Sequence, residues 1–481
     1  MDDDHGAGHD LDQSPDGVFQ GGLTWINGFR PQQVQIWRIA DSSRTSRGPS
    51  PTKDTTTMTM TITTTHIKSG SILLLAATGL AGVALAADPA PAAPATPAAP
   101  ATFLDAVTGG KAHLEFRYRL ETVDQAPLAD DAIASTLRSR LNYQTGEWNH
   151  LSAFLEADNV TVLGNDTYNS TVNGVTDRPV VADPEYTEAN QVYLQLKLGT
   201  FTGIGGRQRI TLDNQRFIGN VGWRQNEQTY DALTFKSSAL AQTQLHYSYI
   251  ANVNRITGPD EGSQPANYHG ATHALNGKVD LGAFGAVTGF AYLLDFENAP
   301  ALSSSTYGAH WAGTYKVSDA TKLNWLASYA SQGDYADNLN DYSADYYLLE
   351  GGATLGKFGL KAGYEVLGGD DQPNHAFQTP LATLHAFQGW ADKFLTTPRG
   401  GVEDLYLGAT ASVGPVALQL VWHDFQAEAF SQDYGSEWNA SAAYKFGAKK
   451  NCEALLKFAD YQADGFATDT TKLWLQFAAT F

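Results

Sequence analysis

The sequence predicts an all-β fold, an antiparallel transmembrane β-barrel of about 18 strands. Residues 471–481 alternate between an apolar face and a largely polar face, and they end on Phe481. With this segment included, about eighteen segments share this alternation. The connections between them alternate between tight turns and longer loops, which is typical of outer-membrane barrels.

The N-terminal region is expected to lie outside the barrel. Residues 1–57 are mixed and polar, and we interpret them as a spurious or disordered N-terminal extension. Residues 58–87 have the features of a signal peptide, because a polar start carrying Lys68 precedes an apolar run that ends in a small-x-small pattern. Residues 88–102 form an extended Pro/Ala linker. The outer-membrane β-barrel is therefore predicted to span 103–481, beginning with a turn of helix.

Each predicted strand has the length that a tilted membrane strand needs. In the first strand, Leu114 and Phe116 share one face, whereas Arg117 and Arg119 share the other. The predicted strands are 113–123, 134–145, 150–160, 190–198, 201–212, 229–238, 241–253, 272–281, 285–297, 305–317, 322–334, 344–355, 358–370, 401–413, 416–428, 435–447, 451–463 and 471–481.

The long connections are predicted to be external loops and the tight ones periplasmic turns. The longest are 161–189, 213–228, 254–271 and 371–400. An even number of strands places both ends of the barrel on the periplasmic side. A large soluble all-β protein is the alternative. Tryptophans near the segment ends argue for interfacial girdles instead, and they are Trp148, Trp223, Trp311, Trp325, Trp390, Trp422, Trp438 and Trp474.

Composition excludes several other classes of protein. The net charge of −20 argues against nucleic-acid binding. The single cysteine, Cys452, cannot form an intramolecular disulfide. Beyond the predicted signal peptide, no apolar run approaches the length of a membrane helix. No H-E-x-x-H, G-x-S-x-G or Walker pattern occurs, so the sequence predicts no enzyme, no metal site and no cofactor.

Arginines spaced two residues apart occur in three predicted strands, at 117/119, 138/140 and 207/209. Both members of such a pair point to the same side of a strand. That side is opposite the apolar residues, so we expect it to face the lumen, since arginine in lipid costs roughly 2–4 kcal/mol. A basic wall favours anions. The other interpretation is a ladder of ion pairs with Glu115, Glu121, Glu156 and Asp158, and the two are compatible.

The most distinctive loop is 213–228, which combines amide side chains with Arg216, Arg224, Phe217 and Trp223. Planar guanidinium groups, amides and aromatic rings suit sugar hydroxyls and carboxylates. We expect this loop to fold into the lumen and narrow it, whereas an ordinary external loop is the alternative.

Several motifs resemble the alginate-export family of outer-membrane porins. They include Glu115-Phe-Arg-Tyr-Arg-Leu-Glu121, Ser135-Thr-Leu-Arg-Ser-Arg-Leu141 and Gly206-Arg-Gln-Arg-Ile210. The resemblance covers roughly 103–481 and implies an 18-stranded barrel with a basic pore. By matching motif it implies pore-lining or substrate-binding roles for Arg117, Arg119, Arg138, Arg140, Arg207, Arg209, Arg216 and Arg224. The tight turn at 448–450 departs from the long turn of the family's alginate exporter, which favours a porin over a dedicated exporter.

The predicted function is a Gram-negative outer-membrane channel for passive diffusion of hydrophilic solutes, with anions or sugar acids preferred. The alternative is a dedicated exporter of an anionic exopolysaccharide such as alginate. An outer-membrane hydrolase and a structural barrel are further alternatives. The expected partners are outer-membrane lipid, small or anionic saccharide solutes and, through Phe481, the barrel-assembly machinery.

Overall fold

The computed structural model describes residues 102–164 and 167–481, and the fold within them is a closed antiparallel barrel. The expectations for 1–57, for 58–87 and for nearly all of 88–102 lie outside the described residues. A short helix, α1 (Phe103–Thr108), precedes the barrel. It begins at Thr102, whose side chain accepts the backbone N–H of Asp105 while the Asp105 carboxylate accepts that of Thr102. No helix among the described residues is long and apolar enough to cross a membrane.

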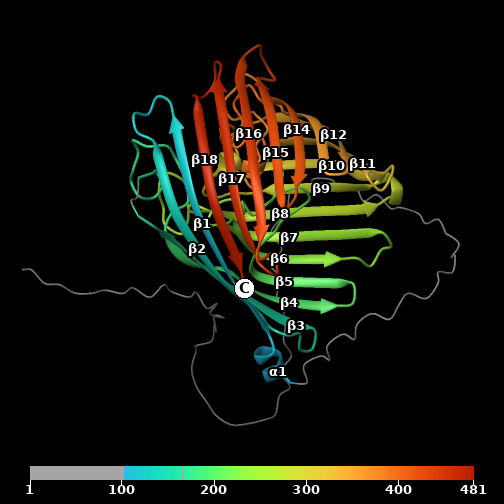
Figure 1. Ribbon diagram of the computed structural model, residues 1–481. Helices are drawn as coiled ribbons and strands as arrows, with labels where there is room; N and C mark the ends of the chain where they lie inside the picture. The colour runs from blue at the N-terminus through green and yellow to red at the C-terminus, as the bar shows by residue number, and fades with distance from the viewer. Residues whose placement is uncertain (1–101, 165–166) are drawn as a thin grey trace, which may run out of the picture. The chain divides into compact units, whose positions relative to one another are not determined.

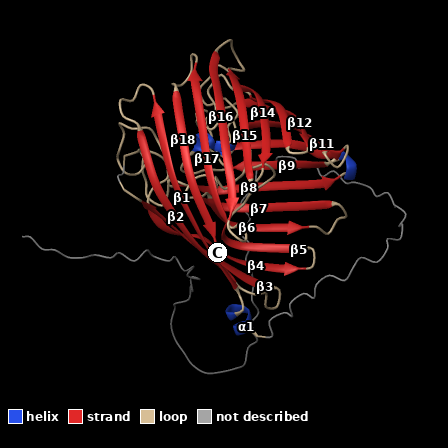
Figure 2. Cartoon of the chain, in the orientation of Figure 1, coloured by secondary structure: helices blue, strands red, loops and turns tan. Residues whose placement is uncertain are grey.

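Eighteen strands form the barrel, in the number and order that the sequence predicts (Figures 1 and 2). They are β1 (Lys111–Gln125), β2 (Ala132–Gln144), β3 (Leu151–Val162), β4 (Tyr186–Leu198), β5 (Phe201–Gln208), β6 (Thr229–Ser237), β7 (Thr243–Asn254), β8 (Asn267–Asp280), β9 (Ala286–Leu294), β10 (Ser304–Lys316), β11 (Thr321–Asp334), β12 (Ser343–Leu355), β13 (Phe358–Leu367), β14 (Val402–Val413), β15 (Val416–Gln426), β16 (Asp433–Phe446), β17 (Cys452–Ala463) and β18 (Thr470–Thr480).

The barrel closes between its first and last strands. β1 pairs antiparallel with β18 from Glu115 opposite Thr480 to Gln125 opposite Thr470. In Figure 1 the blue-to-cyan β1 accordingly lies beside the red β18. Because β1 also pairs with β2 and β18 also pairs with β17, neither β1 nor β18 leaves a free edge.

Side chains alternate between the two faces of the wall. On β18, Lys472, Trp474 and Gln476 are buried, whereas Leu473 and Phe477 are exposed. The polar face therefore points into the barrel and the apolar face points outward, as the period of two predicts. An outward apolar face surrounding a closed barrel is the arrangement that a membrane requires.

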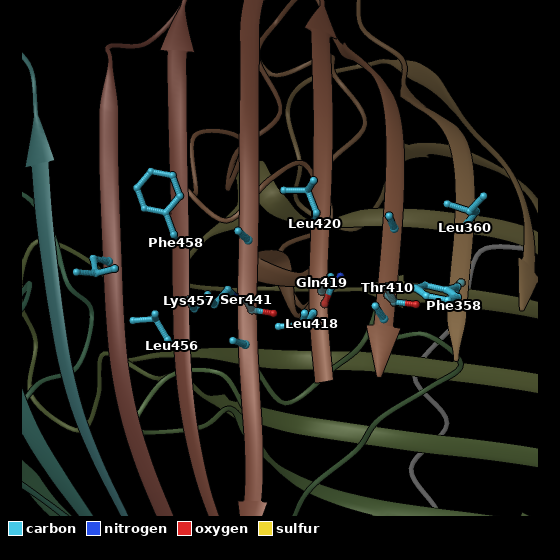
Figure 3. A pocket seen from close by; sticks show the side chains of 16 residues that line it. Phe358, Leu360, Thr410, Leu418, Gln419, Leu420, Ser441, Leu456, Lys457 and Phe458 are labelled. Carbon is cyan, nitrogen blue, oxygen red and sulfur yellow. The ribbon is translucent and has the colours of Figure 1, made fainter. Parts of the chain in front are cut away.

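The outer wall over β13–β18 is grooved rather than smooth. A groove of about 470 Å³ separates leucines on alternate strands, because the strands between them carry small residues such as Ala409 on β14 and Ala442 on β16. Figure 3 shows Leu360, Leu420 and Leu456 from β13, β15 and β17 around this groove.

The predicted ends of some strands are wrong. β5 ends at Gln208, not at 212, because the backbone N–H of Arg209 donates to the Gln191 side chain at 2.9 Å, not to a neighbouring strand. Arg209 therefore belongs to the loop. β4 and β8 begin at Tyr186 and Asn267, four and five residues earlier than predicted.

Replacing Leu456 by arginine tests the orientation of the wall. Leu456 is exposed near the middle of β17, so Leu456→Arg should lower the free energy of unfolding in lipid by about 2–4 kcal/mol. Leu339→Arg is the matched control, because Leu339 is equally apolar but lies exposed in the β11–β12 loop. Equal effects of the two substitutions in denaturant titrations would contradict the assignment of the outward face.

Candidate pore constriction

The β5–β6 loop, residues 209–228, lies inside the barrel. Near its end, the carbonyl of Gly222 and the side chain of Gln225 accept hydrogen bonds from Arg117 on β1, both at 3.0 Å. Near its start, Arg216 donates to Glu365 on β13 at 2.7 Å. Because the loop contacts inward side chains of strands far apart around the sheet, it crosses the lumen. The prediction that this loop enters the lumen is confirmed.

Arg117 and Arg119 hold the loop against β1. Besides its bonds to Gly222 and Gln225, Arg117 donates to the carbonyl of Arg224. Arg119 donates to the carbonyl of Trp223 at 2.6 Å, and its guanidinium lies 4.0 Å from the centre of the Trp223 ring. Both arginine side chains are buried. These two arginines therefore fix the backbone of the loop.

Arg138 and Arg140 on β2 form the predicted ion pairs with inward carboxylates. Arg138 pairs with Glu115. Arg140 donates to Asp158 on β3 at 2.7 Å and lies 3.0 Å from Glu227, at the end of the loop. The ion-pair ladder predicted for these strands is confirmed, and Glu227 extends it onto the loop.

Arg207 and Arg209 are the most accessible of the eight predicted arginines, with about a third of each side chain exposed at 32% and 34%. Arg207 donates to both carboxylate oxygens of Asp231, at 2.8 and 3.2 Å. Arg209 donates to Glu227 at 3.0 Å. Arg207 and Asp231 lie on the outward side of the wall, because the next pair along β5 and β6, Gln208 and Tyr230, is buried on the inward side. Contrary to the sequence prediction, Arg207 therefore does not line the lumen. Arg209 follows β5 in the loop, where it is paired inside the barrel and stays partly exposed.

Arg216 anchors the loop on the far wall. Its side chain is almost fully buried, and it donates to Glu365 at 2.7 Å, to Thr379 at 2.9 Å and to Gln388 at 3.1 Å. Thr379 and Gln388 belong to the β13–β14 loop, residues 368–401, so this second loop also lies inside the barrel. The two loops pair directly through a bridge between Ile218 and Leu381.

Arg224 joins both loops to the wall through Asp392. Its guanidinium donates to Glu121 on β1 and to Asp392 of the β13–β14 loop, each at 3.0 Å. Asp392 also accepts from Lys472 on β18 at 2.8 Å and from His385 Nδ1 at 2.7 Å. The Asp392 carboxylate therefore accepts hydrogen bonds from three side chains, one on β18 and one on each of the two loops.

Burial and charge together set the protonation states in these loops. Burial raises the pKa of Asp392, but His385, Lys472 and Arg224 outweigh it and hold the pKa well below its ordinary value. Burial holds the pKa of His385 well below its ordinary value, so its ring is neutral. Burial opposes ionisation of Glu227 as well, yet Arg140 and Arg209 lower its pKa to about 2. Both carboxylates therefore stay charged at neutral pH.

The structure corrects the prediction for three of the tryptophans. Trp223, Trp390 and Trp474 surround the buried ammonium group of Lys457, with ring centres 4.0, 3.8 and 5.3 Å from it. They belong to the lumen and not to an interfacial girdle, because they lie on inward positions or inside loops. Trp311 and Trp438, by contrast, are exposed on the outer wall.

Sequence reasoning missed the part of the site that the β13–β14 loop supplies. The Lys457 ammonium lies 2.6 Å from His385 Nε2, which accepts its hydrogen bond, and Glu437 accepts the backbone N–H of Ala391 at 2.8 Å. Lys457 and Glu437 could have been noticed as charged residues on inward positions of predicted strands. Nothing in the sequence of 368–401 indicated their partners.

Among residues 102–164 and 167–481, no group of three or more His, Cys, Asp or Glu side chains is arranged to hold a metal ion. The β5–β6 and β13–β14 loops, which form the constriction, present charged side chains, amides and aromatic rings. Such groups bind and orient solutes.

Neither a protein-family model nor a curated protein sequence matches this chain. Solved structures do match it. Pseudomonas aeruginosa OpdL has a TM-score of 0.59 at 14% identity, over 78% of this chain and 99% of that chain. Acinetobacter baumannii OccAB2 gives 0.61 at 15% identity, and P. aeruginosa OpdK with vanillate gives 0.61 at 12% identity, each over 78% of this chain and 99% of that chain.

These comparisons show the fold, and they overturn the resemblance to the alginate-export family. The matching structures are Opd and Occ barrels of 18 strands, and no family model supports alginate export. The motifs do not distinguish the alginate-export family, because any barrel with a charged lumen has Arg and Glu at alternate positions of its strands. The fold class itself, an 18-stranded outer-membrane-type barrel, is confirmed.

Asp392→Asn tests whether ion pairs hold the loops in place. The substitution leaves Arg224 and Lys472 without a carboxylate between them, which typically costs about 3–5 kcal/mol when the pair is buried. We expect single-channel recordings to show a larger, noisier current and thermal scans to show lower stability.

Asp371→Asn is the matched control in the same loop, because Asp371 is exposed and pairs with Arg399 at 3.5 Å. Surface pairs of this kind contribute about 0–1 kcal/mol. If Asp392→Asn behaved like Asp371→Asn, the loops would be held by something other than these charges.

Proposed function

We propose that the chain is an outer-membrane channel through which small hydrophilic solutes, preferably anions, diffuse passively. The observation that carries this proposal is a closed 18-stranded barrel whose lumen is crossed by two loops pinned to its wall. A barrel of this size leaves an aqueous channel, and inward loops narrow it. The apolar outer face of the barrel and the fold of the matching barrels support a location in the lipid of a Gram-negative outer membrane.

We assign the anion preference to Arg209. Its guanidinium group is partly exposed, so N–H groups that face away from Glu227 can meet a passing carboxylate. Arg207 lies on the outward side of β5. The other six predicted arginines are buried against the loops, and their proposed role is to position the constriction. OpdK was solved with vanillate, a small carboxylate, which supports an anionic solute for a barrel of this shape.

A small solute suits this lumen better than a polymer does. A polysaccharide exporter needs a continuous path wide enough for a chain, whereas here two loops are tied to the wall and to each other by buried pairs. The matching Opd and Occ barrels favour the same conclusion.

Two partners follow from the position of the wall and of the C-terminus. Membrane lipid contacts the outward leucines. The Phe481 side chain is exposed while its backbone pairs with Leu114 of β1. This leaves the terminal ring free for recognition by the barrel-assembly machinery.

The reversal potential across a planar bilayer with a KCl gradient tests the function. We expect the protein to conduct and the potential to favour Cl⁻. The substitution Arg209→Gln should reduce the preference for Cl⁻ several-fold, because it removes the partly exposed guanidinium group inside the barrel.

Arg399→Gln is the control, since Arg399 is exposed on the β13–β14 loop and pairs with Asp371 outside the constriction. A cation preference in the unsubstituted protein would mean that the inward carboxylates govern permeation. Absence of any current would exclude a channel.

A further inference from the structure

A polar cavity of about 580 Å³ lies in the lumen, and the described residues that line it include none of the eight predicted arginines. It is formed by the inward faces of β5 to β8 and by the start of the β5–β6 loop. Thr200 and Ser238 belong to short turns, so the cavity lies at the end of the barrel that holds α1 and the C-terminus. It is lined by Thr200, Thr202, Thr211, Leu212, Asp213, Lys236, Ser237, Ser238, Gln244, Leu245, His246, Asn276 and Lys278.

The strand register brings the polar side chains of this cavity together. Thr202 is opposite Lys236, Lys236 is opposite His246, and His246 is opposite Asn276. These four residues form one row across β5, β6, β7 and β8. Gln244 and Lys278 are opposite each other two residues further along β7 and β8, so all six side chains point to the same face.

Lys236 and Lys278 differ from the arginines of the constriction in their charge partners. Within the described residues, no carboxylate pairs with either lysine, whereas Arg140, Arg209, Arg216 and Arg224 each pair with at least one. Two unpaired ammonium groups facing one cavity supply the charge that a carboxylate would neutralise.

Apart from Leu212 and Leu245, the remaining lining residues carry neutral hydrogen-bonding groups and one carboxylate. Asp213 accepts a hydrogen bond from Asn276 at 2.6 Å and lies 3.7 Å from His310 Nε2, so it is already oriented. His246 bonds to Ser248 at 2.8 Å. Hydroxyl groups come from three threonines and two serines, and amides come from Gln244 and Asn276.

We propose that this cavity is a binding subsite for small polyhydroxylated carboxylates of the sugar-acid class, occupied between the constriction and the periplasmic exit. The proposal rests on the channel function given above and names its substrate class. Lys236 and Lys278 hold the carboxylate, and the hydroxyls, amides and Asp213 bind the solute's hydroxyl groups. Among the described residues, no Phe, Tyr or Trp ring lines the cavity, so a benzene carboxylate gains less binding energy here than a sugar acid does. The volume falls in the range of small-molecule sites.

Blockade of the ion current by added solute tests the subsite. Glucuronate is added on the side of the short turns to the full chain in a planar bilayer, and the concentration that halves the current is measured. Lys236→Gln/Lys278→Gln should raise that concentration about tenfold or more, because charge-assisted hydrogen bonds are lost. Blockade by benzoate should change less.

Two controls separate this proposal from the channel function and from misfolding. Lys449→Gln/Lys450→Gln removes two lysines from the β16–β17 turn, away from the cavity, and should leave blockade unchanged. Thr202→Val keeps both lysines and should weaken blockade by glucuronate but not blockade by benzoate. If the protein selects anions but the two double lysine variants show the same blockade by glucuronate, the subsite proposal is contradicted and the channel proposal stands. The same holds if the substitution of Lys236 and Lys278 weakens blockade by benzoate as much as blockade by glucuronate. If the protein passes no anions, the channel proposal itself fails.

Discussion

Charges buried inside the barrel need partners, and that constraint organises the lumen. Arg216 and Arg224 lie on the same loop, and each loses contact with water in the folded protein. A buried guanidinium without a carboxylate is strongly destabilising. Glu365 on one side of the barrel and Glu121 and Asp392 on the other therefore decide where the β5–β6 loop can lie. The loop crosses the lumen because its two charges are satisfied only when it does.

The rest of the interior follows from this crossing. The β13–β14 loop supplies Asp392 and Gln388 to the two arginines, so it is drawn into the barrel as well. Lys457, between three tryptophan rings and His385, then fastens that loop to β17. The wall contributes charges at alternate positions, and the loops contribute the complementary ones. Positions of the wall that the loops do not cover, such as Lys236 and Lys278, keep their charge available to solutes.

The wall was predictable from the sequence and the interior was not. Side chains alternate along a strand, so Lys472, Trp474 and Gln476 could be assigned to one face without any knowledge of their neighbours. The contacts that define the constriction join residues far apart in the sequence, such as Arg216 with Glu365, 149 positions away. No local pattern specifies which carboxylate an arginine meets. Trp474 illustrates the difference, because alternation puts it on the face of Lys472 and Gln476, but the prediction of an interfacial girdle was wrong, and only the fold places the ring beside Lys457.

The measurement that tests this account most directly is the single-channel conductance of a variant in which residues 214–226 are replaced by a short Gly/Ser linker. If the β5–β6 loop narrows the lumen, its removal gives a severalfold larger conductance and weaker discrimination between Cl⁻ and K⁺. The same replacement in the β11–β12 loop should change neither quantity. Unchanged conductance and selectivity after removal of 214–226 would contradict the account.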